Sequence, residues 1–153
     1  MAVRVLAVGG VDSSGGAGLF ADLRAVEALG ACFVSATTAL TAQNERGVLS
    51  VQPSSLDQFA NELRAAFCRR VHAVKTGMLA SAAHVGVLCA ALDAMGFGGP
   101  IVVDPVLAAT HGGKLIDAAG IEAMQKALFP RAALITPNLP EAKAFAGCAD
   151  EPA

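Results

Sequence analysis

Glycines and small polar side chains fill residues 9–18 (GGVDSSGGAG) of this 153-residue chain. The segment follows a short apolar run and precedes a helical pattern. Glycines let backbone N–H groups approach a ligand, and the N-terminus of the following helix favours an anion or a polar group. The same composition is typical of a flexible strand-to-helix turn without a ligand, so the segment alone leaves both interpretations open.

Amide and thioether side chains follow two further apolar runs. Residues 38–44 (TALTAQN) end in Gln43 and Asn44, whose amides both donate and accept hydrogen bonds and therefore suit the edge of a nitrogen heterocycle. Residues 75–79 (KTGML) include Met78, which is able to pack on a flat ligand. A polar loop and an ordinary core methionine are the competing interpretations.

Two carboxylates complete the candidate site. Asp104 ends another apolar run, and a carboxylate there is suited to hold Mg²⁺ through water, although Asp-Pro is also a common turn. In residues 136–141 (TPNLPE), Asn138 is placed to cap a helix while Glu141 faces the same pocket. A glutamate in a first turn also stabilises the helix dipole, which is a purely structural explanation.

The three histidines show no metal-binding spacing. We expect His72 and His84 to be structural, whereas His111, in a glycine-rich stretch, is a weaker candidate for contact with a phosphate.

Strand-like and helix-like patterns alternate along the chain. The expected strands are residues 3–8, 33–40, 48–51, 71–75, 101–104 and 133–136. The expected helices cover residues 19–29, 55–67, 81–95 and 121–128, with one more starting at Asn138 and a capping box at Ser55 and Gln58. This order predicts a single α/β domain over residues 1–153, with a doubly wound, mainly parallel sheet and helices on both faces. Ligands bind at the carboxyl ends of such strands, so the polar segments should converge.

Composition excludes several classes of function. The formal net charge is −2 and no basic stripe is present, which argues against a nucleic-acid partner. No uninterrupted apolar run reaches the roughly 18 residues needed to span a membrane. The four cysteines form no CxxC pair and no secretory signal is visible, so we expect reduced thiols and a cytoplasmic location.

Taken together, the polar segments resemble the hydroxymethylpyrimidine/phosphomethylpyrimidine kinases of thiamine biosynthesis, which have a ribokinase-like fold. The matching segments are residues 10–18, 21–23, 38–44, 77–79, 104–106 and 136–141. The resemblance implies a phosphotransferase that uses ATP and Mg²⁺ to phosphorylate 4-amino-5-hydroxymethyl-2-methylpyrimidine and then its monophosphate. Such chemistry depends on positioning and charge neutralisation of a loose phosphoryl transition state.

The resemblance also implies roles for individual residues. Gln43 would hydrogen-bond the aminopyrimidine ring, and Asn138 would lie near the nucleotide phosphates. Asp104 and Glu141 would position Mg²⁺ and its waters. The remaining pyrimidine-pocket residues would be Gly10, Ala17, Asp22, Met78 and Val106.

The chain departs from the family pattern in two places. Family members are longer and carry a Gly-Thr-Gly-Cys type turn, which supplies the anion hole; no such turn follows Glu141, and no catalytic residue is assigned. His111 stands where the family more often has a small hydroxyl residue. The chain therefore looks like the N-terminal, substrate-binding portion only. A C-terminally incomplete sheet would have a bare edge and an apolar face, so we expect a homo-oligomer or a poorly soluble chain with weak or no activity.

Three other functions would use part of the same residue pattern. A pyridoxal/pyridoxine kinase of the same fold would also bind a substituted nitrogen ring. A non-catalytic pyrimidine-binding module would keep Gln43 and Met78 but never use ATP. Residues 16–21 also match the G-x-G-x-x-A pattern of Rossmann oxidoreductases, but no acidic residue closes the second strand to hold a ribose.

Overall fold

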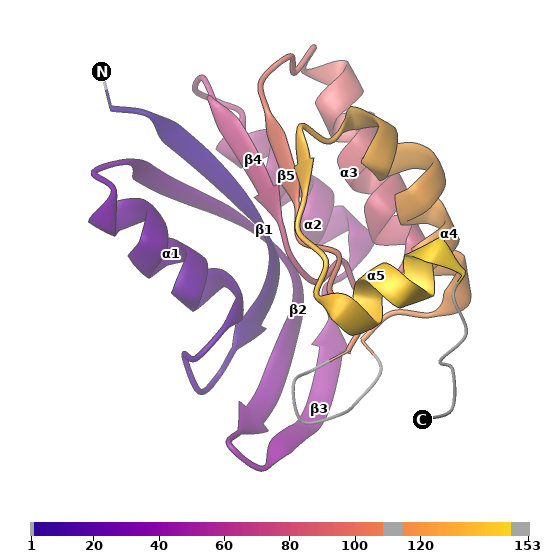
Figure 1. The fold of residues 1–153 in the computed structure, drawn as a ribbon. Coiled ribbons are helices and arrows are strands. Elements are labelled where there is room, and N and C mark those ends of the chain that lie inside the picture. The colour runs from indigo at the N-terminus through magenta and orange to yellow at the C-terminus, as the bar shows by residue number, and fades with distance from the viewer. Residues whose placement is uncertain (1, 109–114, 148–153) are drawn as a thin grey trace.

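The structure, a computed structural model, describes residues 2–108 and 115–147. In this part of the chain, six strands form one sheet in the order β3-β2-β1-β4-β5-β6 (Figure 1). All neighbouring strands are parallel except β3, which pairs with β2 in the antiparallel direction. The strands are β1 (Arg4–Asp12), β2 (Cys32–Asn44), β3 (Gly47–Pro53), β4 (Ala73–Thr76), β5 (Ile101–Val103) and β6 (Leu134–Ile135).

Helices cover both faces of the sheet, as predicted (Figure 1). The α-helices are α1 (Gly18–Ala28), α2 (Leu56–Ala66), α3 (Ala82–Ala94), α4 (Ala118–Ala123) and α5 (Leu139–Ala146). α1 lies on one face, and α2 and α3 pack side by side on the other. Within residues 2–108 and 115–147, no helix has the length and apolar character needed to cross a membrane.

Side chains of β1 point alternately to the two faces of the sheet, and each face is covered by a different layer of helices (Figure 1). Leu6 and Val8 are fully buried in the main core, together with Phe59 and Leu63 of α2. Successive side chains of a strand point to opposite faces, so Gly9 faces the other way, and an ideal Cβ there would lie 3.8 Å from Leu19 of α1. The chain therefore builds one core beneath α2 and α3 and a thinner layer beneath α1.

Local sequence signals placed most helices correctly, with two corrections. The predicted capping box of α2 is only half formed: the Ser55 side chain accepts from the Gln58 backbone, but the Gln58 amide donates to Glu62 instead. The helix predicted over residues 121–128 is α4 followed by a π-helical turn (Met124–Leu128) and a 3₁₀ turn (Phe129–Arg131). Pro130, in the 3₁₀ turn, has no backbone N–H to donate, so the regular helical hydrogen bonds do not continue past it.

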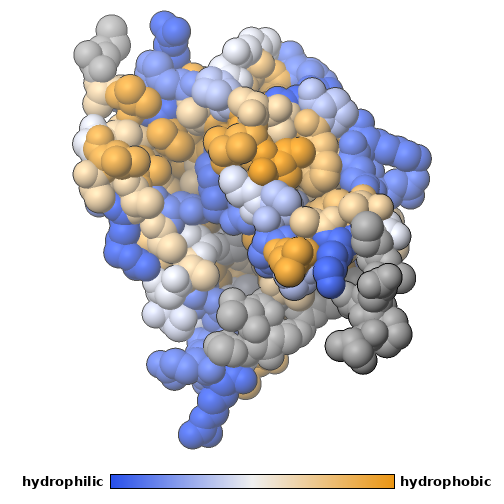
Figure 2. Space-filling model, viewed as in Figure 1, coloured by the Kyte–Doolittle hydropathy of each residue, from blue (hydrophilic) through white to orange (hydrophobic). Residues whose placement is uncertain are grey.

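The last strand, β6, lies at an edge of the sheet, as expected. Leu134 on β6 is 55% exposed, and apolar side chains gather over β5 and β6 in the space-filling view (Figure 2). Among the described cysteines, Cys32, Cys68 and Cys89 are free thiols, while Cys148 lies outside the described residues. The prediction of a homo-oligomer stays a prediction.

His84 has a structural role, as the sequence suggested. The ring is buried at the start of α3, 5.3 Å from the Phe59 ring. Its Nδ1 lies 2.8 Å from Ser81 Oγ, and its Nε2 lies 3.2 Å from the Ser54 carbonyl oxygen. Burial lowers the pKa of His84, against the opposing effect of the hydrogen bond to the Ser54 backbone. The fold therefore favours the neutral ring. His72 is structural too, since its Nδ1 accepts from the Arg4 backbone.

This lowered pKa predicts acid sensitivity of the fold. The contribution of His84 to stability is fully present above the ordinary pKa of 6.5 and is lost as the pH falls below it. Between pH 7.5 and 5.5, the free energy of unfolding measured in urea should therefore fall more in the wild type than in His84→Gln. His72→Gln serves as the control, and equal losses in the wild type and His84→Gln would contradict the prediction.

Candidate functional site

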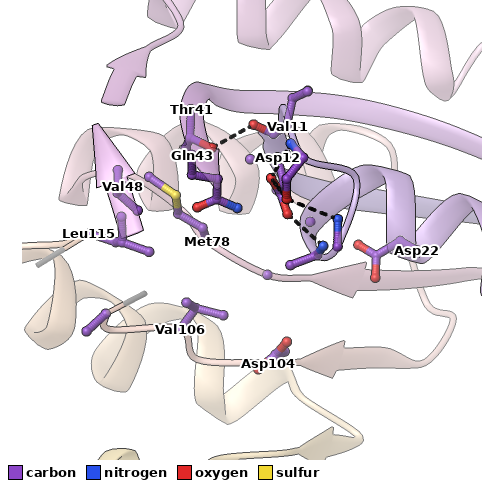
Figure 3. Close-up of a pocket in the computed structure, with 18 of the residues that line it drawn as sticks. Val11, Asp12, Asp22, Thr41, Gln43, Val48, Met78, Asp104, Val106 and Leu115 are labelled. Atoms are coloured by element: carbon purple, nitrogen blue, oxygen red, sulfur yellow. Dashed lines mark hydrogen bonds between the residues drawn. The ribbon is translucent and has the colours of Figure 1, made fainter. Parts of the chain in front are cut away.

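A cleft of about 500 Å³ opens at the carboxyl edge of the sheet (Figure 3). The strand order reverses there: from β1 the chain moves outward to β2 and then returns to β4 on the other side. Such a switch point leaves a crevice in which ligands bind. All nine residues to which the resemblance assigns a role line this cleft, and Gln43 and Asp104 share it. The nine are Gly10, Ala17, Asp22, Gln43, Met78, Asp104, Val106, Asn138 and Glu141.

The glycine-rich segment is folded around Asp12, whose importance the sequence did not reveal. β1 continues past the predicted end at residue 8 and stops at Asp12, which is buried. The Asp12 carboxylate accepts three hydrogen bonds of 2.8 Å, from the Ser14 N–H, the Ser14 hydroxyl and the Ala17 N–H. The segment therefore curls back on its own strand, which places Ala17 in the cleft wall. An Asp followed by Ser-Ser-Gly is the available sequence signal for such a turn.

Burial on its own would raise the pKa of the Asp12 carboxyl. Hydrogen bonds from Ser14, from Gln43 and from the backbone outweigh burial and lower that pKa. The carboxylate is therefore charged and fixed at the base of the loop.

Gln43 reaches the cleft from the end of β2. Its backbone N–H donates to Ser13 Oγ at 3.0 Å, and Thr41 Oγ1 donates to the Val11 carbonyl at 3.1 Å. These bonds tie the end of β2 to the end of β1. The Gln43 amide points into the space between Asp12 and Met78 (Figure 3).

Apolar side chains form the opposite part of the cleft. Met78 is held in place because the buried Thr38 hydroxyl donates to its carbonyl oxygen at 2.6 Å. Val48, Val106 and Leu115 lie on the same side of the cleft as Met78 (Figure 3). A cleft that is apolar on one side and polar on the other suits a flat ring with hydrogen-bonding groups at its edge.

An ammonium group joins two carboxylates at the acidic side of the cleft. Lys75 Nζ lies 3.0 Å from Asp22 Oδ1 and 3.5 Å from Asp104 Oδ2. The pattern of residues 75–79 predicts no role for Lys75. A charged side chain in a short, largely buried strand is the available sequence signal for Lys75.

Asn138 and Glu141 occupy the start of α5. Asn138 Oδ1 accepts from the Glu141 N–H, and Glu141 Oε2 accepts from the Asn138 N–H, both at 2.9 Å. This is the helix cap predicted from the sequence, and Glu141 both caps α5 and faces the cleft.

The carboxylates of Asp104 and Glu141 are ligand types that suit a hard cation with further water and phosphate ligands. Within the described ranges, no three or more His, Cys, Asp or Glu side chains cluster to hold a metal. Asp104 and Glu141 nevertheless line one cleft, and Mg²⁺ typically takes one or two protein carboxylates, with water and substrate phosphates completing its shell. His111, the weaker phosphate candidate, lies outside the described residues.

Comparisons with known proteins place these features in a family. The family model described as phosphomethylpyrimidine kinase matches residues 12–152. The chain is 41% identical over 141 residues to the hydroxymethylpyrimidine/phosphomethylpyrimidine kinase of Mycobacterium tuberculosis (strain H37Rv), covering 92% of this chain and 51% of that protein. It is 44% identical over 144 residues to the thiamine biosynthesis bifunctional protein ThiED of Geobacter sulfurreducens, covering 94% of this chain and 29% of that protein. The chain thus spans about half the length of the mycobacterial kinase.

Solved structures agree on the ribokinase-like fold. The phosphomethylpyrimidine kinase of Clostridium difficile 630 superposes with a TM-score of 0.86 at 36% identity, over 95% of this chain and 63% of that chain. The pyridoxal kinase of Staphylococcus aureus in complex with pyridoxal gives a TM-score of 0.88 at 30% identity, over 100% of this chain and 56% of that chain. The family match also favours a kinase over the oxidoreductase alternative. The chain therefore belongs to the phosphomethylpyrimidine kinase family.

Proposed function

We propose that the protein uses ATP to phosphorylate 4-amino-5-hydroxymethyl-2-methylpyrimidine and its monophosphate in thiamine biosynthesis. The observation that carries the proposal is the convergence of Gln43, Met78, Asp104 and Glu141 on one cleft at the switch point of the sheet. The family match and the printed names of the relatives support the same reaction. Homo-oligomeric assembly and a cytoplasmic location belong to the same proposal.

In this proposal the pyrimidine lies between the two sides of the cleft. The Gln43 amide pairs with the edge of the ring, since an amide donates and accepts as an aminopyrimidine does. Met78 and Val106 pack against the face of the ring. Gly10 leaves room for this packing, because an ideal Cβ there would lie only 3.2 Å from Met78 Sδ. Ala17 and Asp22 complete the pyrimidine pocket.

Asp104 and Glu141 are the residues that would hold Mg²⁺ and its waters. A bound Mg²⁺ supplies charge neutralisation to the phosphoryl group in transfer. Asn138, at the N-terminus of α5, lies beside Glu141 and is placed near the nucleotide phosphates in this proposal. We assign no proton-transferring residue among the described side chains.

A pyridoxal kinase is the second candidate, because the Staphylococcus aureus pyridoxal kinase superposes over the whole of this chain. A substituted pyridine would also fit between Gln43 and Met78. Turnover of the two substrates by the same preparation distinguishes the two kinases. Calorimetry with the pyrimidine and with Mg-ATP separately distinguishes both from a non-catalytic pyrimidine-binding module, which would bind only the first.

The variant Gln43→Ala tests the proposal. It should weaken binding of the hydroxymethylpyrimidine by roughly 1–3 kcal/mol in calorimetry, because the buried polar groups of the ring would lose the amide with which they form hydrogen bonds. Gln52→Ala, on β3 and exposed, is the matched control and should bind normally. Unchanged affinity in Gln43→Ala would remove this residue from the site.

Asp104→Asn should weaken Mg²⁺-dependent nucleotide use more than pyrimidine binding.

A further inference from the structure

Lys75 lines the cleft beside Asp22 and Asp104, and the proposed function gives it no role. Its Nζ is 3.0 and 3.2 Å from the two carboxylate oxygens of Asp22, on α1, and 3.5 Å from Asp104 Oδ2, after β5. The side chains of Lys75, Asp22 and Asp104 are 29%, 17% and 35% exposed. One ammonium group thus joins the pyrimidine-pocket side of the cleft to its carboxylate side, in contact with solvent.

The backbone beside Lys75 is shaped to leave room for the ammonium. An ideal Cβ at Gly77 would lie 3.3 Å from Lys75 Nζ, so a larger residue there would push the ammonium away. Gly77 is itself fixed, because its N–H donates to the Val8 carbonyl at 2.7 Å. Partly solvated ion pairs add little to stability, typically about 0–1 kcal/mol. Stability alone is therefore a weak reason to place this charge in a ligand cleft.

We propose that Lys75 is a positioning residue that serves as the resident counter-ion of Asp104 and competes with a divalent cation for its carboxylate. The inference rests on the proposed function in one respect, the assignment of Asp104 to the cation. When a cation binds Asp104, repulsion between the positive charges moves the ammonium toward Asp22, which is already its nearer partner. Asp22 thus keeps the displaced ammonium paired after the cation has bound Asp104.

The test measures Mn²⁺ binding to the whole chain without nucleotide, by calorimetry and by the electron paramagnetic resonance signal of free Mn²⁺. Lys75→Met should raise the affinity about fivefold or more, because the competing charge is gone. Asp22→Asn should lower the affinity several-fold, because the ammonium is left to Asp104 alone. Lys126→Met, whose ammonium pairs with Glu122 on the surface, should behave as the wild type.

The double variant Asp22→Asn/Lys75→Met separates competition from a general effect of charge. If Asp22 acts through Lys75, Asp22→Asn should change Mn²⁺ affinity little in the Lys75→Met background. A full several-fold loss there would overturn the inference, as would unchanged or weaker Mn²⁺ binding by a folded Lys75→Met chain. If Lys75→Met does not fold, an unchanged affinity in Asp22→Asn overturns it instead. Failure here with normal pyrimidine binding leaves the proposed function standing, whereas absent pyrimidine binding with the expected Mn²⁺ shifts counts against the function alone.

Discussion

Gly18→Ala should lower the free energy of unfolding by roughly 2–5 kcal/mol, the sum of a left-handed backbone penalty and forced overpacking. Gly18 has φ +57° at the first residue of α1, a conformation that residues with a Cβ rarely adopt. An ideal Cβ at this position would overlap the carbonyl oxygen of Gly10. Backbone atoms cannot move aside as a flexible side chain would, so the start of α1 has to shift.

The shift should damage the cleft as well as the fold. Gly18 forms an isolated bridge with Val11, which joins the start of α1 to the end of β1. Gly10 and Ala17 lie in these two segments and line the cleft. Urea unfolding and pyrimidine calorimetry measure the two effects. The matched control is Gly86→Ala, in an exposed part of α3 with no atom near its ideal Cβ, which should be neutral or stabilise by up to about 1 kcal/mol. Similar results for the two variants would disprove this explanation.

Asp12→Ala should lower the free energy of unfolding by about 2–4 kcal/mol, since hydrogen bonds to charged groups each contribute about 1.5–3 kcal/mol and water replaces some of them. The Ser14 N–H, the Ser14 hydroxyl and the Ala17 N–H all lose their common acceptor. Ser14→Ala is the control, because it removes only one of these donors and should cost less.

The effect of Asp12 should also depend on pH in a defined direction. Because the pKa of Asp12 is lowered in the fold, its contribution is fully present above the ordinary value of 3.8 and is lost as the pH falls through the lowered value. The difference in the free energy of unfolding between the wild type and Asp12→Ala should therefore be smaller at pH 3 than at pH 7. A gap of the same size at both pH values would contradict this role for the carboxylate.

The sequence predicted the convergence of the site better than the details of its loops. A parallel sheet brings the residues after its strands to one edge, so the polar segments that follow the apolar runs had to meet. The Asn138–Glu141 cap was predictable because its partners stand three residues apart and need no tertiary contact. Such features depend on local spacing and on the direction of the strands.

Features that depend on pairing between distant segments were missed. Gly9-Gly10 indicated the end of a strand, yet β1 continues to Asp12 because its backbone pairs with β2 through a shift in register at these glycines. The ion pairs of Lys75 join residues 53 and 29 positions away along the chain, and no local pattern encodes them. Propensity cannot report a contact that only the assembled sheet creates.

Because Glu141 caps the first turn of α5 with its carboxylate and also lines the cleft, its position has to satisfy two requirements at once. Glutamine would keep an oxygen acceptor for the Asn138 N–H but lose the negative charge, and aspartate would keep the charge on a stem too short to reach back. Loss of activity in a Glu141 variant would therefore have two explanations, fraying of α5 and loss of the negative charge in the cleft. A separate measurement of the helical structure of α5 is needed to distinguish them.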